Sequence, residues 1–259
     1  MSSPWKAYWD RSLAVLRANT SRVLRAEADP SAKSHLIYAI NRDTRLQDFA
    51  TGCDADIGGK SECTLDVDEQ GDGRFWGEVR RDVRAEWRGK VRGGYAGFRN
   101  KALPSLFGTQ HHDLSLFTHL ALTVRPSGEP KTWRHWFVNI QTDGPVRSDL
   151  FQHRLPLPSP NNLAAVNKWQ TVHIPLSSFV LTNSGALSET QITMLKSKVR
   201  TVGLSILGSE RVQESAATSD EEGLEGSHTA LQEAGPGVEG KFELGIRKIE
   251  AVRRDEDAL

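Results

Sequence analysis

Residues 120–142 read LALTVRPSGEPKTWRHWFVNIQT, and the pattern in this stretch decides the fold class. In Leu120–Arg125, Leu and Val alternate with Ala, Thr and Arg until Pro126 ends the run. In Trp133–Thr142, the apolar residues Trp136, Val138 and Ile140 occupy every second position. A period of two is typical of a strand that buries one face, because successive side chains point to opposite sides. The stretch therefore predicts two strands of a sheet with one buried face.

The same pattern recurs on both sides of this stretch. The strands that it predicts are Leu46–Ala50, Glu62–Val67, Arg74–Val79, Tyr95–Phe98, Leu120–Arg125, Trp133–Thr142, Asp149–Leu155, Gln170–Ile174, Val199–Leu207 and Phe242–Val252. Only Ser188–Lys198 has the spacing of an interior helix, and Trp169 and Phe179 are expected to be core anchors. Short strands separated by turns favour an all-β fold, an antiparallel sandwich or jelly roll. A doubly wound parallel sheet is disfavoured because helices do not alternate with the strands.

The overall composition excludes several classes of protein. The chain has 259 residues, with 33 Lys and Arg against 33 Asp and Glu, so its formal net charge is zero. The hydrophobic content of 37%, with the 22 glycines added, is that of a globular domain, and no apolar run approaches the ~20 residues of a membrane span. A chain without a basic excess is not expected to bind nucleic acid. Cys53 and Cys63 are too few for a disulfide framework or a four-cysteine zinc site; they favour a reducing compartment and leave one bridge open.

Charge is unevenly distributed along the chain. Residues 209–240 contain eight acidic residues and one basic residue, Arg211, so this segment has a net charge of −7 and the remainder +7. The segment has no apolar periodicity and is rich in Ser, Glu, Gly and Ala. Such a composition cannot bury enough apolar surface to offset the entropy of ordering. We therefore expect a disordered acidic insertion at 208–240 within a sandwich domain of residues 31–252, followed by a charged tail at 253–259.

Residues 1–30 form a separate N-terminal segment with a helical pattern. Ser3 and Pro4 suit the cap and the first position of a helix, and Pro30 ends it. At about 100° per residue, one half of this amphipathic helix is apolar and the other half is basic. The apolar half contains Trp5, Tyr8, Trp9, Leu13, Val15, Leu16, Val23 and Leu24, and the basic half contains Arg11, Arg17, Arg22 and Arg25. Such a helix resembles a mitochondrial targeting segment, and it also suits a helix that packs on the domain or on a partner.

The motifs in the sequence do not predict catalysis, a metal site or a cofactor. Gly58–Ser61 lacks the first glycine of a phosphate-binding loop, and no helix follows it. His111, His112 and Asp113 are adjacent, so in an extended segment their side chains do not converge on one ion. The sequence has no nucleophile elbow. We therefore predict no catalytic, cofactor-binding or metal-ligating residue, and a protein that is not an enzyme.

Two further features are candidates for partner binding. Arg88–Tyr95 reads RGKVRGGY, and a single short segment of this type is more typical of a basic turn than of a repeated RNA-binding tail. Arg88 and Arg92 belong to a modest positive patch in this region. Trp133, if exposed, could stack on a sugar ring or on a partner.

Several segments together resemble one protein family. They are Leu46–Phe49, Cys53–Ser61, Gly94–Arg99, Asp113–Ser115, Phe137–Thr142, Trp169–Phe179, Val202–Ile206 and Gly240–Leu244. The GYAGFR and WQTVHIPLSSF blocks carry most of the specificity. On these residues the chain resembles the complex I intermediate-associated protein 30 family, the mitochondrial assembly factors of NADH:ubiquinone oxidoreductase. The acidic segment 208–240 departs from the compact pattern of that family.

The resemblance implies a galactose-binding-like β-sandwich, related to carbohydrate-binding modules, that acts as a chaperone with no catalytic residue and no cofactor. It implies a protein of the mitochondrial matrix, peripheral to the inner membrane if the N-terminal helix is retained. The implied partners are membrane-arm subunits or assembly intermediates of complex I and other assembly factors, and not nucleic acid. The residues that we predict to bind partners are Trp5, Trp9, Leu13, Leu16, Arg88, Arg92 and Trp133. The alternative is a carbohydrate-binding module on the same fold, which would need an aromatic platform on its concave face.

Overall fold

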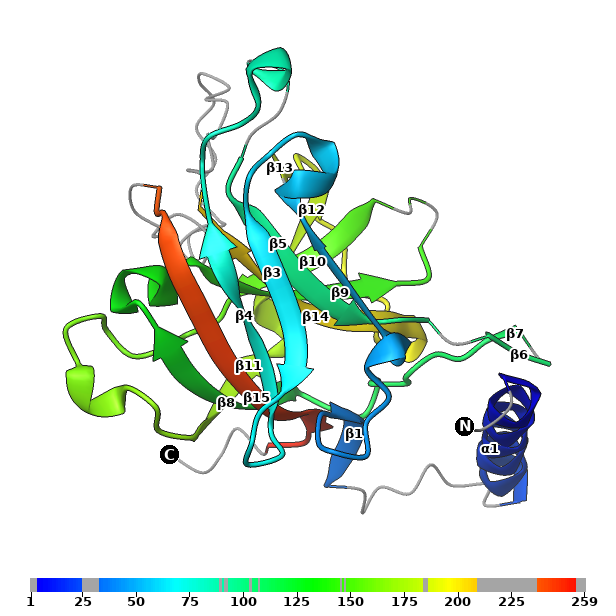
Figure 1. The fold of residues 1–259 in the computed structure, drawn as a ribbon. Coiled ribbons are helices and arrows are strands. Elements are labelled where there is room, and N and C mark those ends of the chain that lie inside the picture. Colours follow the sequence, from blue (N-terminus) through cyan, green and yellow to red (C-terminus); the bar gives the residue numbers. More distant parts are fainter. Residues whose placement is uncertain are drawn as a thin grey trace, which may run out of the picture.

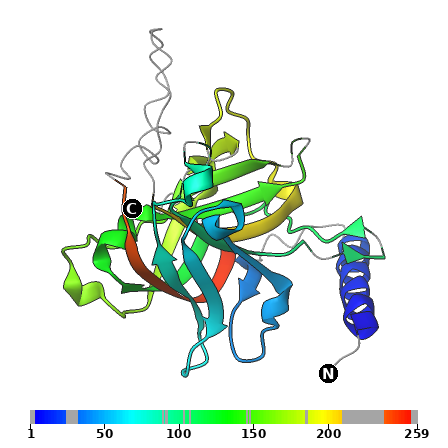
Figure 2. The ribbon, with the colours of Figure 1, turned by 45° about the horizontal axis from the view of Figure 1, so that its top comes forward.

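The computed structural model places two antiparallel β-sheets face to face, with one helix outside them (Figure 1). It describes residues 4–24, 33–88, 90, 93–102, 104–106, 108–144, 146, 148–183, 186–208 and 237–254. Figure 2 shows the two sheets as curved layers and the helix to one side of them. The all-β sandwich that the strand pattern predicts is therefore confirmed.

The first sheet is organised around the 13-residue strand β15 (Gly240–Val252). Its strands run in the order β11-β8-β15-β4-β3, and β1 pairs with the part of β15 that lies beyond β4. The bounds of these strands are β1 Ser34–Ala39, β3 Glu62–Val67, β4 Gly73–Val79, β8 His119–Gly128 and β11 Gln170–Pro175. Because β15 bonds β8 along one side and both β4 and β1 along the other, it holds the sheet together.

The second sheet has the strand order β13-β12-β10-β9-β14-β5-β2. Its strands are β2 Phe49–Cys53, β5 Tyr95–Asn100, β9 Trp136–Thr142, β10 Asp149–Arg154, β12 Val180–Asn183, β13 Ala186–Leu187 and β14 Val199–Leu207. Two short strands, β6 (Pro104–Ser105) and β7 (Gly108–Thr109), form a separate hairpin that we call the arm. The arm follows β5 and extends away from the sandwich toward the helix (Figure 1).

Side chains that alternate along the strands fill the space between the sheets. Trp136, Val138 and Ile140 of β9 are fully buried, as their spacing predicts. The ring of Phe75 in β4 lies 6.1 Å from that of Trp136 and 5.4 Å from that of Phe242, measured between centroids. Aromatic pairs at such separations stabilise a core beyond their buried area. One hydrophobic cluster therefore joins both sheets.

The strand predicted at Leu120–Arg125 is longer than predicted. It continues through Pro126 to Gly128, although proline cannot donate a backbone hydrogen bond. The strand β11 pairs with β8 only as far as Val124, and the carbonyl of Pro126 accepts a bond from the N–H of Asn167 on that side instead. The nitrogen of Pro126 therefore points to the side where β11 has already ended, so no strand partner loses a hydrogen bond there.

The helix predicted at Ser188–Lys198 is wrong. These residues follow an irregular path that ends in one turn of 3-10 helix, η7 (Lys196–Lys198). The side-chain amide of Gln191 accepts from the N–H of Leu181 at 2.7 Å and donates to its carbonyl at 3.1 Å, and Met194 is buried in the core. Side-chain contacts with β12 thus replace the hydrogen bonds of a helix.

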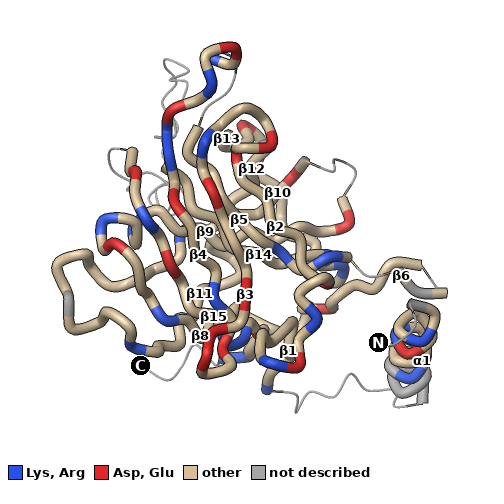
Figure 3. The backbone as a smooth tube through the Cα atoms, in the orientation of Figure 1, with Lys and Arg blue, Asp and Glu red and all other residues tan. Residues whose placement is uncertain are grey.

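Trp169 is not the core anchor that the sequence suggests. Its half-buried indole lies on the outer face of the first sheet, between the guanidinium carbons of Arg125 at 4.9 Å and Arg247 at 4.1 Å from the ring centroid. Arg125 donates to Asp68 at 2.7 Å, and Arg247 donates to Asp72 at 2.8 Å. Figure 3 shows basic and acidic residues close together on the strands of this sheet. The indole is therefore covered by paired arginines rather than by the core.

Phe179 is buried, in agreement with its predicted place in the core.

Both cysteines are free thiols at the edge of the sandwich, and the thiol of Cys53 donates to the carbonyl of Ser61 at 3.1 Å. Burial and the neighbouring Cys53 thiol raise the pKa of Cys63 to about 12. A bridge between these residues is thus not formed in this structure.

The acidic segment at 209–236 lies outside the described residues, so the predicted insertion stays a prediction. The described residues on its two sides are close in space, because the N–H of Val238 donates to the carbonyl of Gly208 at 2.7 Å. Gly208 in turn donates to the carbonyl of Gly94 at 2.6 Å. The described residues before and after the segment, Gly208 and Val238, thus lie beside each other at one point of the sandwich.

Candidate interaction surfaces

The helix α1 (Pro4–Leu24) contacts the arm rather than the sheets (Figures 1 and 2). Ala7 and Ser12 are buried at this contact. The hydroxyl of Ser12 donates to the carbonyl of Tyr8 at 3.0 Å and accepts from the N–H of Leu106 at 3.0 Å. Small side chains at these positions let the backbones of the helix and the arm approach each other.

An ion pair also links α1 to the sandwich. The guanidinium of Arg11 lies 3.4 Å from one carboxylate oxygen of Asp48, in the 3-10 turn η1 (Leu46–Asp48). Arg45 lies 3.4 Å from the other oxygen. The sequence places Arg11 on the basic half of the helix, and the structure shows that this half partly faces the protein's own domain.

The apolar half of α1 is exposed along one stripe. The exposed side chains are Trp5 (72%), Trp9 (52%), Leu13 (45%) and Leu16 (45%). They lie within about 80° of one another around the helix, and we call them the α1 stripe. Lys6 and Arg17 are exposed beside it. Four of the residues predicted to bind partners are thus brought together on one surface.

The other predicted partner-binding residues lie elsewhere. Arg88 is exposed just after the 3-10 turn η3 (Ala85–Trp87), in the loop at the top of Figure 1, whereas α1 lies at the lower right. Arg92 is outside the described residues. Arg88 therefore does not belong to the same surface as the α1 stripe.

The structure does not support the predicted role of Trp133 in partner binding, because that role requires an exposed side chain. It lies in the 3-10 helix η4 (Pro130–His135) that precedes β9, and its side chain is fully buried. Its indole N–H donates to the carbonyl of Ser127 at 2.9 Å. The 3-10 geometry breaks the strand alternation before Trp136, and this turns Trp133 inward.

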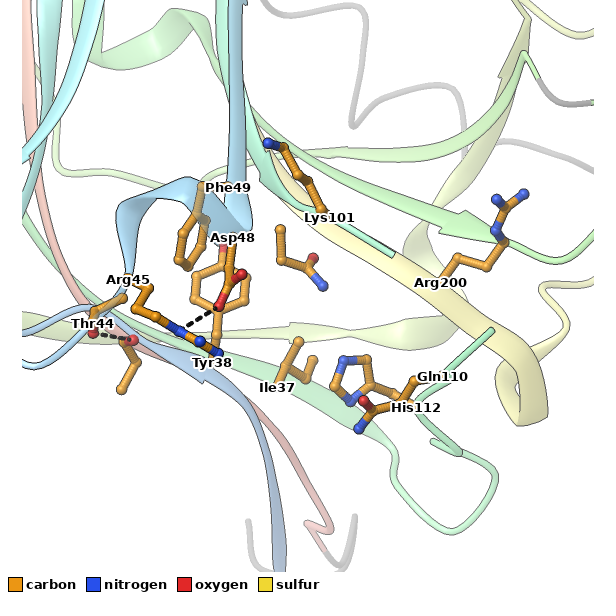
Figure 4. Close-up of a pocket in the computed structure, with 12 residues that line it drawn as sticks. Ile37, Tyr38, Thr44, Arg45, Asp48, Phe49, Lys101, Gln110, His112 and Arg200 are labelled. Carbon is orange, nitrogen blue, oxygen red and sulfur yellow. Dashed lines mark hydrogen bonds and ion pairs between the residues drawn. The ribbon is translucent and has the colours of Figure 1, made fainter. Parts of the chain in front are cut away.

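A basic pocket lies where the arm leaves the sandwich, with a volume of about 350 Å³ (Figure 4). Its walls come from β1, η1, the end of β5, the segment before β8, and β14. We define it by Tyr38, Arg45, Asp48, Lys101, His112 and Arg200. Asp48 is shared between this pocket and the ion pair with α1, so the two surfaces meet at one carboxylate.

Two titratable groups of the pocket are held neutral. Burial raises the pKa of the Tyr38 hydroxyl far above its usual range. Burial, and then the neighbouring His35 and His111, lower the pKa of His112 to about 4. His112 shares a hydrogen bond of 3.1 Å with His35, whereas His111 faces Asp143 at 3.7 Å. The adjacent histidines thus diverge, as the sequence predicts for an extended segment.

The pocket could not be found from the sequence. Its residues come from segments that are far apart in the chain, and none of these segments carries a ligand-binding motif. The described ranges contain no group of three His, Cys, Asp or Glu side chains suited to a metal ion. In the same part of the chain, no helix has the length and the hydrophobicity that crossing a bilayer requires.

The outer face of the second sheet is mostly polar across β9, β10 and β14. The amide of Gln152 donates to that of Asn139 at 2.6 Å, and Asn139 donates to the hydroxyl of Ser205 at 2.9 Å. Phe137, on the same face, is buried. Tyr95 is the aromatic side chain that stays exposed on the described part of this face.

The fold and these surfaces define a class of β-sandwich proteins with an outlying amphipathic helix and a basic pocket beside it. Comparison with known families gives the identification. The chain belongs to the complex I intermediate-associated protein 30 family, whose model matches residues 38–245.

Two curated relatives bear the name Complex I intermediate-associated protein 30, mitochondrial. That of Neurospora crassa is 32% identical over 229 residues, which cover 79% of this chain and 78% of the relative. That of Drosophila melanogaster is 26% identical over 190 residues, which cover 70% of this chain and 60% of the relative. The family resemblance inferred from the sequence is thus confirmed.

Solved structures show a more distant likeness. An exo-beta-agarase aligns with a TM-score of 0.40 and 11% identity, over 86% of this chain and 26% of that one. A carbohydrate-binding module specific for non-crystalline cellulose aligns with a TM-score of 0.33 and 9% identity, over 85% of this chain and 94% of that one. Likeness at these scores says nothing about a ligand, and the sandwich is defined by its own two sheets.

Proposed function

We propose that this protein is a non-enzymatic assembly factor of mitochondrial complex I that binds membrane-arm intermediates through the α1 stripe. The observation that carries the proposal is the exposure of Trp5 and Trp9, at 72% and 52%, on a helix that the arm holds beside the sandwich. The names of the curated relatives support the assembly role. The family and the charge pattern of the helix support a place in the matrix, at the inner-membrane surface.

The physical argument rests on the cost of exposed apolar surface. Removal of apolar area from water is favourable by roughly 25 cal/mol per Å² before the entropic costs of association are subtracted. Tryptophans are prominent among the residues whose truncation weakens binding by about 2 kcal/mol or more. An assembly intermediate exposes subunit surface that a later subunit will cover. A helix with an apolar stripe suits such surface, and Lys6 and Arg17 at its rim suit an anionic bilayer nearby.

The test uses the double variant W5A/W9A, expressed with a foreign presequence so that import does not depend on α1. We expect loss of co-purified complex I intermediates and a lower level of assembled complex I on native gels. Trp87→Ala is the matched control, because Trp87 is also exposed, at 42%, but lies in η3, away from α1 (Figure 1). Unchanged co-purification and assembly with a folded W5A/W9A protein would refute the proposal.

A further inference from the structure

Both cysteines of the chain lie where the two sheets meet along one edge. Cys53 is the last residue of β2, and Cys63 is the second residue of β3. The strand β2 ends the second sheet and β3 ends the first, and residues 54–61 join the two strands directly. Each sheet therefore contributes one cysteine to this edge.

The two cysteines face the space between the sheets. Cys53 is paired with Ala96 of β5, which is fully buried. Cys63 is paired with Gly77 of β4, and Phe75, two residues before that glycine, is fully buried. Paired residues and residues two apart lie on the same face of a sheet, so each cysteine points inward. Both are partly exposed and pack against the core, so the fold orients two thiols toward each other at an edge that is not sealed.

The two thiols are also in contact. They are close enough to share a hydrogen bond, and the thiol of Cys53 donates to the carbonyl of Ser61 at 3.1 Å. Sulfur atoms that already touch approach the bonding distance of ~2 Å mainly by rotation of their side chains. Since both are free thiols in this structure, the bond between them is available to form.

We propose that Cys53 and Cys63 are a redox-active pair, which a low-molecular-weight disulfide such as glutathione disulfide converts into a reversible disulfide between the two sheets of the folded protein. This modification site goes beyond the assembly role proposed above and does not depend on the α1 stripe. The bond fastens the sheets to each other at the edge formed by β2 and β3.

The reaction consists of two exchange steps. The thiolate of Cys53 attacks one sulfur of glutathione disulfide, so a bond forms between Cys53 and one glutathione, and the other glutathione leaves and takes up the proton from Cys53. The thiolate of Cys63 then attacks the Cys53 sulfur, which forms the protein disulfide and releases the second glutathione with the proton from Cys63. Two protein thiols are thus oxidised to one disulfide, while one glutathione disulfide is reduced to two thiols.

The surroundings of Cys63 set the order of these steps. Burial, and then the charge and the hydrogen bond of Cys53, raise the pKa of Cys63. A thiol that stays protonated is a poor nucleophile, so Cys53 reacts first. Once Cys53 carries glutathione, it no longer raises the pKa of Cys63 in these ways, and this favours the second step.

The first experiment exposes the reduced, purified full chain to mixtures of glutathione and glutathione disulfide. Remaining thiols are blocked with a maleimide, and the intact mass and the unreduced peptides are measured. Because the chain has 2 cysteines, an internal disulfide can only join Cys53 to Cys63. We expect the linked peptide to increase with the share of glutathione disulfide and to disappear when reduced glutathione is restored. Two free thiols, a glutathione on each cysteine, or links between chains would each overturn the proposal.

The second experiment tests the order of the steps with two single variants. Cys63→Ser should accumulate the glutathione adduct at Cys53, because the thiol that resolves it is missing. Cys53→Ser should react with glutathione disulfide about tenfold more slowly than Cys63→Ser, since burial still keeps its remaining thiol protonated. Equal rates for the two variants would overturn the proposed order.

The third experiment measures thermal unfolding of the reduced and the oxidised parent. The oxidised parent should melt roughly 5–10 °C above the reduced parent, because a cross-link restricts the unfolded chain. Cys63→Ser treated with the same glutathione mixture is the matched control and should show no such rise. An oxidised parent that melts at or below the temperature of the reduced parent would show that the folded protein does not place these thiols for a disulfide, and would overturn the proposal.

Discussion

Two groups of tryptophan side chains near the surface of this molecule have opposite surroundings. Trp169 lies between two arginines, and each of these donates to an aspartate of the same sheet. Trp5 and Trp9 lie on α1 with half or more of their surface exposed. The protein therefore covers one apolar surface with its own charged side chains and leaves the other uncovered. The first surface is thus covered within the fold, and the second is the surface that our proposal assigns to another molecule.

The contacts around Trp169 explain why the two arginines stay stacked on its indole. A guanidinium stacked on an indole contributes about 0.5–2 kcal/mol, depending on how far water is excluded. The carboxylate of Asp68 is largely buried and accepts a hydrogen bond from Arg125, which fixes the orientation of that guanidinium. The hydrogen bonds that Asp68 accepts outweigh its burial and lower its pKa. Within the described residues, neither Trp5 nor Trp9 has a guanidinium stacked on its ring, and the exposed charged side chains of this part of α1 are Lys6, Asp10 and Arg17.

The largest expected loss of stability belongs to the fully buried Trp133. Trp133→Ala should lower the free energy of unfolding by about 3–5 kcal/mol, because Trp133 is fully buried and its indole N–H is bonded to Ser127. Chemical denaturation of the parent and the variant measures the difference. A variant that unfolds like the parent would show that Trp133 is on the surface, as its predicted partner-binding role requires.

The next effect tests the cover of Trp169. Trp169→Ala should lower the free energy of unfolding by about 2 kcal/mol, since it removes a half-buried ring and two cation–π contacts. Trp169→Phe is the matched control and should lose less than half of that amount, because a smaller ring remains between the arginines. Equal losses for the two variants would show that the shape of the indole, and not the stacking, matters.

A third prediction concerns how stability depends on pH at His112, in the basic pocket, and at Asp66, in β3 of the first sheet. The pKa of His112 in the folded chain, about 4, is below its ordinary value near 6.5, so the unfolded chain binds this proton more readily. Stability from this site is present above pH 6.5 and is lost as the pH falls toward 4. The pKa of Asp66 is lowered by Arg74, so its contribution is lost only as the pH falls below the ordinary value for Asp. The melting temperature of His112→Gln should therefore change less between pH 4 and pH 7 than that of the parent. The melting temperature of Asp66→Asn should change with pH as the parent's does over this range.

The smallest expected effect on stability belongs to the uncovered tryptophans. Trp5→Ala and Trp9→Ala should each change the free energy of unfolding by no more than about 0.5 kcal/mol, as for other exposed side chains. The measurement is the same denaturation assay as for Trp169→Ala. A loss near 2 kcal/mol for either variant would place that tryptophan in a contact within the folded chain and would remove the contrast.

The strands that are easiest to predict are those whose apolar and polar residues alternate in the sequence. In β9, for example, Trp136, Val138 and Ile140 show the alternation directly. The strand β1 was not predicted because its register shifts between Leu36 and Tyr38, which breaks the period of two. The strand β12 was not predicted because Val180, Leu181 and Thr182 are all buried, so it shows no alternation at all.

The candidate surfaces were predictable to different degrees. The α1 stripe is visible in the sequence because its residues are local and follow the helical period. The same pattern could not show that Arg11 turns toward Asp48, since that contact depends on where the helix lies. Trp169 was misplaced because Arg125 and Arg247, which cover it, are distant in the sequence. The pocket was not foreseen for the same reason.

The central strand β15 has a consequence for the order in which the protein can be made. It bonds β1, β4 and β8, and all three precede it in the chain, so they are synthesised before residues 240–252. Until β15 has left the ribosome, the first sheet is incomplete, with the edges of β4 and β8 unpaired and prone to association. We expect the nascent chain to need protection of these edges until β15 has emerged, whatever the folded protein later does for others.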